Sequence, residues 1–309
     1  MDSVPYNFCR SVVYGLDYSY RLRPKFKESK WKEAFEKFER RKCFTLYLCK
    51  TDSGWKYGFD DKIDNIRTPF LTIAELRKLP DFENIRIKKL VFSNANTKEV
   101  FYYKKELVGL SRPLNVTLGQ LFKFIQSICS VNQLNLHINH EFTSEEASEV
   151  IQGIDQWLFE SIVIYGYQPA YDNLLRTQRL KNSLENNVSA LLCLTAASFS
   201  RESLEIMEDL IVTSKFNRYE IYSYIPIGYF SFDVFERFFE NAVKNPKDKE
   251  SLIAPFNTAA FEQLRSFKHE FLVRFEENSE DGSLLYEWTI SENLEFELQT
   301  NNQMCYFRR

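Results

Sequence analysis

Four short apolar runs recur in the middle of the chain at almost constant spacing. They begin at Leu134, Ile162, Leu191 and Tyr219, so successive starts lie 28, 29 and 28 residues apart. A helix-like segment occupies each interval. A repeat of about 20 to 50 residues is typical of a solenoid, in which each unit can bury its apolar face only against its neighbours. The spacing therefore predicts parallel strands linked by helices, a design that usually presents a broad binding surface rather than a catalytic pocket.

Hydrophobic periodicity predicts the individual elements of the repeats and of the region that follows them. Apolar residues at helical spacing predict helices over 118–128, 144–157, 174–184, 200–213, 232–243 and 258–267. Apolar or alternating runs predict strands over 134–138, 162–166, 190–195 and 217–223, and three more over 269–276, 284–290 and 294–298. Polar turns separate the last three strands, so we expect an antiparallel meander that protects the open edge of the parallel stack.

The first third of the chain has a different pattern. Helices are predicted over 4–16, 30–41 and 73–79, and strands over 43–49, 55–59, 85–92 and 100–103. Asp52-Ser53-Gly54 separates the first two strands and predicts a β-hairpin. Together the patterns predict an α/β chain, α+β in detail. Its expected parts are a small helical module (1–42), a β-rich connector with the hairpin (43–110) and an irregular leucine-rich-repeat-like solenoid that ends in antiparallel strands (111–309).

The composition argues against several classes of protein. The chain has 28 Phe and 17 Tyr but only 9 Gly, and the glycines include no GxGxxG or GxxxxGK motif. Two common nucleotide-binding loops are therefore missing from the sequence. The net charge of −3 gives no general attraction to nucleic acid or to anionic membranes. No apolar stretch approaches the roughly 18 residues that a membrane span needs, so we expect neither a nucleic-acid nor a membrane partner.

One local concentration of positive charge lies near the N-terminus, where six basic residues are interleaved with Phe26 and Trp31. They are Arg21, Arg23, Lys25, Lys27, Lys30 and Lys32. Because the chain as a whole is acidic, we interpret this run as a solvated loop and helix face rather than a contact for nucleic acid.

The cysteines indicate the compartment. Cys9, Cys43, Cys49, Cys129, Cys193 and Cys305 are scattered without any CxxC pair, and most lie inside apolar runs. The N-terminus carries Asp2 and no basic-then-apolar signal pattern. Both observations favour buried, reduced thiols in the cytoplasm or the nucleus over a disulfide framework.

Catalytic and metal-binding signals are few. The sequence contains no GxSxG, HExxH or kinase motif. His137 and His140, with Glu141 next to the second, are interpreted as strand and turn residues rather than metal ligands, because no cysteine completes a tetrahedral set. Cys193 lies in an apolar run, which favours an inert thiol. We therefore expect no cofactor and no enzymatic activity; a deep pocket that gathers several ionisable side chains would revive the hypothesis of an enzyme of unrecognised type.

Residues 1–42 combine a Val4-Pro5 start, a short apolar helix and a second helix that carries Trp31. This segment resembles a degenerate F-box of the large nematode-type families with divergent C-terminal domains. The resemblance implies a substrate receptor of a cullin-RING (SCF-type) ubiquitin ligase, which binds a Skp-type adaptor and an unknown protein target. It also implies an adaptor-binding surface made of Val4, Pro5, Phe8, Val12 and Leu16, with Trp31 as a brace.

Two alternatives stay open. The segment 18–27 is basic and contains Pro24, where the family has a leucine-rich helix. The N-terminal helices are therefore interpreted alternatively as a cap on a solenoid binding scaffold that has no link to ubiquitin ligases. Tyrosines near the strand ends are candidate contacts for a partner, and their alternative role is packing in the core or at an edge; they are Tyr165, Tyr167, Tyr222 and Tyr224.

Overall fold

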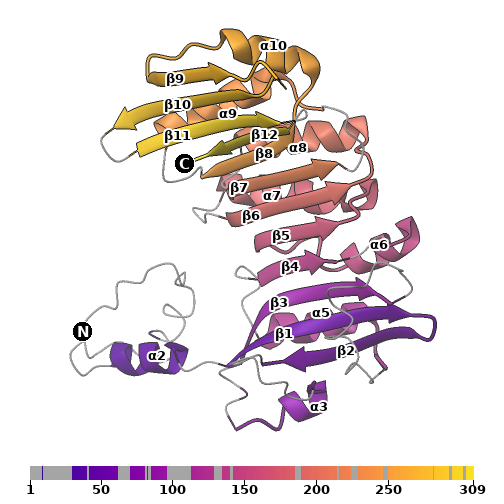
Figure 1. Ribbon diagram of the computed structural model, residues 1–309. Coiled ribbons are helices and arrows are strands. Elements are labelled where there is room, and N and C mark those ends of the chain that lie inside the picture. The colour runs from indigo at the N-terminus through magenta and orange to yellow at the C-terminus, as the bar shows by residue number, and fades with distance from the viewer. Residues whose placement is uncertain are drawn as a thin grey trace. The chain divides into compact units, whose positions relative to one another are not determined.

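The protein has a mixed α/β fold that divides into two compact units. The computed structural model describes residues 9, 30–39, 42–61, 70–80, 82, 85–95, 113–128, 134–139, 142–184, 189–213, 216–223, 229–245, 250–280, 282–291, 294–301 and 304–309. These residues contain eight α-helices and twelve strands (Figure 1). The units are Met1–Asn135 and Leu136–Arg309. Within the described part of the chain, every helix is too short or too polar to cross a lipid bilayer.

The first unit is built around a three-stranded arrangement. Its described elements are α2 (Lys30–Glu39), β1 (Cys43–Thr51), β2 (Gly54–Asp60), α3 (Ile73–Leu76), β3 (Arg86–Asn94) and α5 (Leu118–Ile128). β1 and β2 form the predicted antiparallel hairpin, and β3 pairs with β1 in parallel. Helix α5 contacts β3, where the rings of Phe92 and Phe122 meet edge to face.

The second unit contains the repeated strands. Strand β4 (Leu134–Ile138) crosses the boundary between the units and belongs to the second from Leu136 on. The helical elements that follow are α6 (Ser144–Ile151), the 3-10 turn η3 (Pro169–Tyr171), α7 (Asp172–Leu184), α8 (Arg201–Thr213), α9 (Phe232–Lys244) and α10 (Thr258–Ser266). The strands are β5 (Phe159–Tyr165), β6 (Ser189–Ala196), β7 (Phe216–Ser223), β8 (Ser251–Pro255), β9 (Leu272–Glu277), β10 (Leu284–Ser291), β11 (Leu294–Asn301) and β12 (Met304–Arg308).

These strands form one sheet in the order β4-β5-β6-β7-β8-β12-β11-β10-β9. β5 to β8 pair in parallel, each with the next in sequence, whereas β12, β11, β10 and β9 pair antiparallel. Helices α7, α8 and α9 contact one another in sequence order and lie behind the strands in Figure 1. The helices therefore cover one face of the sheet.

Five helical segments, α6, η3, α8, α9 and α10, start in a shared way. In each case a buried aromatic residue lies two positions before the first helical residue. The aromatic residue and the residue after it form the pairs Phe142-Thr143, Tyr167-Gln168, Phe199-Ser200, Phe230-Ser231 and Phe256-Asn257. In three pairs the second residue caps the helix, because Thr143, Ser200 and Asn257 each accept a hydrogen bond from a backbone N–H three residues later. Such caps satisfy amides that have no partner within the helix, while the aromatic ring anchors the turn to the core.

The densest aromatic packing lies between α9 and the antiparallel strands. The ring of Phe239 lies within 4.8 to 6.1 Å, centroid to centroid, of six other rings, namely those of Phe235, Phe267, His269, Trp288, Phe296 and Phe307. Phe239 is completely buried. Helix α9 therefore attaches the antiparallel part of the sheet to the same core as the parallel part.

Most elements predicted from the sequence are confirmed. Helix α6 ends at Ile151 rather than at residue 157, because Gln152 leaves the helical region and Gly153 has a φ of 95°, which favours glycine. Strands β8 and β12 were not predicted, and β12 rather than β9 joins the meander to the parallel strands. The predicted helix 4–16 and strand 100–103 lie outside the described residues. The division into 1–42, 43–110 and 111–309 stays a prediction.

Replacement of Phe239 by alanine tests the aromatic core. We expect Phe239→Ala to lower the free energy of unfolding by about 3–5 kcal/mol, because it leaves a cavity among six rings. Urea-induced unfolding measures the change. Leu180→Ala is the control, since that side chain is 63% exposed and its loss should change stability by no more than about 0.5 kcal/mol. Equal effects of the two substitutions would contradict the assignment.

Candidate functional site

The sheet of the second unit has two unlike faces. On β6, Leu192 and Leu194 lie opposite Tyr219 and Ile221 of β7, and all four side chains are completely buried. Tyr219 packs on Phe238 of α9 and donates a hydrogen bond to a carbonyl of α8, so this face meets the helices. Because successive side chains of a strand point to opposite faces, the residues between them lie on the other face.

We call that other face the open face. Following the register from β5 to β12, it carries Ser161, Val163, Tyr165, Leu191, Cys193, Thr195, Arg218, Glu220, Tyr222, Ser251, Ile253, Met304, Tyr306 and Arg308. Val163, Cys193 and Ile253 lie in one row across the strands, with Glu220 between the last two. We call these three residues, which retain 5 to 7% exposure, the apolar centre. Tyr165, at 39%, and the half-buried Tyr222 and Tyr306 surround it. The open face thus combines an apolar centre with accessible aromatic rings.

Charge on the open face is concentrated around Glu220. The Nη2 atom of Arg218 lies 3.3 Å from Oε1 of Glu220. Burial raises the pKa of the Cys193 thiol to about 12, and the charge of Glu220 and a hydrogen bond to it act in the same direction. Burial, then the charge of Glu220, raises the pKa of Tyr222 to about 12, although Arg308 opposes the shift. At neutral pH both groups are therefore protonated hydrogen-bond donors, and the Cys193 thiol is a poor nucleophile.

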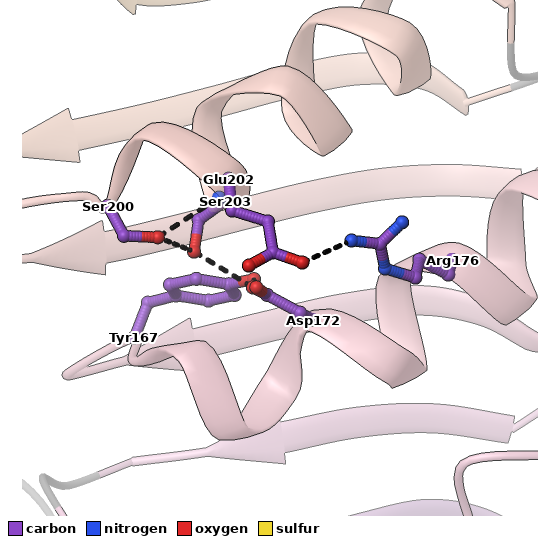
Figure 2. A network of polar contacts seen from close by, with 6 residues as sticks. All are labelled: Tyr167, Asp172, Arg176, Ser200, Glu202 and Ser203. Carbon is purple, nitrogen blue, oxygen red and sulfur yellow. Dashed lines mark hydrogen bonds and ion pairs between the residues drawn. The ribbon is translucent and has the colours of Figure 1, made fainter.

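A buried polar network lies where β5 and β6 end and α7 and α8 begin (Figure 2). Asp172, the first residue of α7, is 8% exposed. Its Oδ1 atom accepts a hydrogen bond of 2.6 Å from the hydroxyl of Tyr167 and one of 2.9 Å from the hydroxyl of Ser203. The Oγ atoms of Ser200 and Ser203 are 2.8 Å apart. The network thus connects the first turn of α7 to the first turn of α8.

The hydrogen bonds of this network run in one direction. The backbone N–H of Ser203 donates to Ser200 Oγ, and the Ser203 hydroxyl donates its only proton to Asp172. The hydroxyl of Ser200 must therefore donate to that of Ser203. Every donor leads to one carboxylate, which also lies at a helix N-terminus, where negative charge is favoured. The arrangement satisfies a buried charge, and we interpret it as structural.

The outer surface of α7 and α8 carries a shallow groove. Arg176 pairs with Glu202 and Arg179 with Asp209, each at 2.7 Å, and these ion pairs flank the exposed Leu180. The four charged side chains are 44 to 70% exposed, so each pair contributes only about 0–1 kcal/mol. The groove therefore joins two neighbouring helices and offers little buried surface to a ligand.

The residues predicted to bind partners are placed as follows. Tyr165 and Tyr222 lie on the open face, whereas Tyr167 is buried and its hydroxyl is used by Asp172. Tyr224 lies outside the described residues, as do Val4, Pro5, Phe8, Val12 and Leu16. Trp31 is half-buried on α2.

Of the residues considered for metal binding, the structure describes His137 and His269. His137 is half-buried on β4, and His269 packs among aromatic rings, whereas His140 and Glu141 lie outside the described residues. Among the residues that the structure describes, no cluster of three or more His, Cys, Asp or Glu side chains could hold a metal ion.

Sequence reasoning missed the charged members of the open face. Arg218 and Glu220 alternate with Tyr219 and Ile221, so period-two alternation in this run was the available signal. Tyr306 and Arg308 lie on β12, which was not predicted, and no local signal connected them with β7. Asp172 and Ser203 are 31 residues apart, and only the fold brings them together.

Comparison of the chain with protein-family models, with curated proteins and with solved structures gives no match.

Removal of the Tyr167 hydroxyl tests the buried network. We expect Tyr167→Phe to lower the free energy of unfolding by about 1–3 kcal/mol, because Asp172 loses a donor in a buried site. Tyr165→Phe is a matched control on the open face, where the exposed side chain should tolerate the change. Chemical denaturation of both variants measures the difference, and a neutral Tyr167→Phe would show that the network adds no stability.

The same residue predicts a response to alkaline pH. Burial, then the hydrogen bond to Asp172 and its charge, holds the pKa of Tyr167 well above its ordinary value of 10.0. Below pH 10.0 the phenol is protonated in both states and its contribution is complete. As the pH rises above 10.0 the unfolded chain loses this proton first, so the contribution is progressively lost.

We therefore expect the free energy of unfolding to fall less steeply above pH 10.0 in Tyr167→Phe than in the wild type. The difference in slope should reach about 1.4 kcal/mol per pH unit, the value for one proton. Urea unfolding at pH values on both sides of 10.0 measures the slopes, and identical slopes would exclude this linkage.

Proposed function

We propose that the chain is a non-enzymatic protein-interaction module that holds a protein target on its open face. The observation that carries the proposal is the unlike character of the two sheet faces. One face is completely buried under helices, while the other presents Tyr165, Tyr222 and Tyr306 around an apolar centre.

The chemistry of the open face suits a protein partner. Tyrosine and arginine are enriched at protein interfaces, because they combine apolar contact area with hydrogen bonding. Arg218 and Arg308 lie on the exposed part of this face, beside Tyr222, whose raised pKa keeps it protonated at neutral pH. Burial keeps the Cys193 thiol protonated within the apolar centre, where the side chain packs against its neighbours. These features favour recognition over covalent chemistry.

The proposed architecture is an irregular leucine-rich-repeat-like solenoid. It is supported by the parallel pairing of β5 to β8 and by the buried aromatic residue that recurs before α6, η3, α8, α9 and α10, followed in three cases by a helix cap. In such an arrangement the strands of successive units form a continuous surface, and a partner contacts several units at once.

We further propose that this module is a substrate receptor of a cullin-RING ubiquitin ligase, which uses residues 1–42 to bind a Skp-type adaptor. The support is the N-terminal resemblance to a degenerate F-box, of which helix α2 with Trp31 is the described part. The alternative keeps the open face as a binding scaffold, with the N-terminal helices as a cap and no ligase link.

A double substitution tests the open face. We expect Tyr222→Ala/Tyr306→Ala to abolish capture of the target, because it removes two accessible rings of the open face, of which Tyr306 lies opposite Ile253. Proximity labelling in cells compares this variant with the wild type and with Arg201→Ala, an exposed change on α8. Proteins lost only in the tyrosine variant are targets of the open face. A labelling profile unchanged from wild type would exclude this face as the binding surface.

Co-purification with a Skp-type adaptor tests the ligase link separately. We expect the wild type to recover the adaptor and Phe8→Asp/Leu16→Asp to lose it, because charges cannot be buried in an apolar contact. The open-face variant Tyr222→Ala/Tyr306→Ala should recover the adaptor normally. If wild type and the Asp variant recover it equally poorly, while deletion of residues 1–42 lowers thermal stability, the scaffold alternative holds.

A further inference from the structure

Strand β9 forms the outer edge of the sheet in the second unit, with β10 as its only neighbour among the described strands. Every residue of β9 after Leu272 is exposed. Val273 is 69% and Phe275 42% exposed, and these two are among the few large apolar side chains that the described surface presents. An exposed edge strand with apolar residues is a template for pairing with another strand.

The hairpin to β10 shows which backbone groups of β9 are free to pair. The N–H of Asn278 donates to the carbonyl of Ser283, so Asn278 faces β10. Because backbone groups of successive strand residues point to opposite sides, Arg274 and Glu276 also face β10, while Phe275 and Glu277 face outward. The register shifts at Val273, which has no partner on β10. The N–H and C=O groups of Phe275 and Glu277 thus belong to the outer edge.

The side chains of β9 alternate between the two sheet faces. Phe275 lies opposite Tyr286, with ring centroids 4.8 Å apart, on the helix-covered side. Arg274 and Glu276 lie on the open face, where Arg274 pairs with Glu276 at 2.8 Å and with Glu287 of β10 at 3.1 Å. The edge therefore presents one positive and one negative residue, two positions apart, on a single face.

This order of charges is complementary to itself. When two copies of β9 pair antiparallel with Phe275 opposite Phe275, each Arg274 lies opposite the Glu276 of the other copy. The outward groups of Phe275 then pair with those of Phe275 in the other copy, and Glu277 lies opposite Val273. The two nearest shifts that keep the outward groups paired place either Arg274 opposite Arg274 or Glu276 opposite Glu276. Of these three registers, only the one centred on Phe275 avoids like charges.

We propose that β9 is a homodimer contact, through which two copies of the chain join their sheets edge to edge about a two-fold axis. A self-complementary edge suits a second copy, since a two-fold contact brings the same patch of both subunits together. The contact consists of short strands and a small apolar pair, so the dimer is weak and depends on concentration. It leaves Tyr222 and Tyr306 free and is independent of the target proposed for the open face.

Sedimentation equilibrium of the full chain over a concentration series tests the proposal. We expect a reversible shift from monomer to dimer mass in the wild type. Phe275→Pro should abolish the shift, because it removes an outward N–H while the pairing of β9 with β10 uses other residues. Leu180→Asp, which changes an exposed apolar residue on α7, should dimerise like the wild type.

Charge exchange tests the register. Arg274→Glu and Glu276→Arg should each raise the dissociation constant of the dimer at least about tenfold, because each places like charges opposite one another twice. The double variant Arg274→Glu/Glu276→Arg should restore the dimer. Thermal unfolding of each variant confirms that the monomer is folded, since the ion pairs of Arg274 are exposed.

Two results would overturn the proposal: a wild type that stays monomeric at every concentration, or a dimer that persists in Phe275→Pro. A dimer that is lost in both single charge variants and not restored in the double variant would overturn the register centred on Phe275.

Discussion

The burial of one sheet face beneath helices is the constraint on which the second unit depends. Each parallel strand contributes alternate apolar side chains to that face, and the helix that follows begins next to a buried aromatic residue. The ring anchors the turn, and the capping side chain satisfies the first amides of the helix. Each strand, with the turn and the helix that follow it, therefore buries its apolar side against the neighbouring strands and helices of the second unit.

This constraint also determines which side chains are left for the proposed binding surface. Since the helices occupy one side, the alternate side chains of β5 to β12 define the open face. Tyrosines, arginines and Glu220 are found there beside the apolar centre, whereas the opposite side of β6 and β7 carries completely buried leucine, isoleucine and tyrosine side chains. Hydrogen bonds to Asp172 connect the segments that follow β5 and β6. These bonds fix the turns at the ends of two strands that carry the open face.

Much of the fold followed from local patterns in the sequence, and the site followed less well. The hairpin of β1 and β2, helix α5 and the strands β4 to β7 were predicted, because periodicity and turn residues act over short distances. The five residues of β8 and of β12 gave no usable period. Tyr165 and Tyr222 were predicted from their position near strand ends. Arg308 lies close to Tyr222 because β12 pairs with β8, and no local sequence pattern indicates that pairing. The prediction that α6 extends to residue 157 was wrong, because the positive φ of Gly153 is incompatible with a continuing helix.

The position of β12 has a consequence for biosynthesis. This strand comes after β9, β10 and β11 along the chain, yet it lies between β8 and β11 in the sheet. During translation the parallel strands can assemble as they leave the ribosome, but the antiparallel hairpins cannot pair with β8 through the sheet until β12 has emerged. Until then β8 and β11 both expose strand edges, and a nascent chain stalled in this interval is a natural substrate for chaperones.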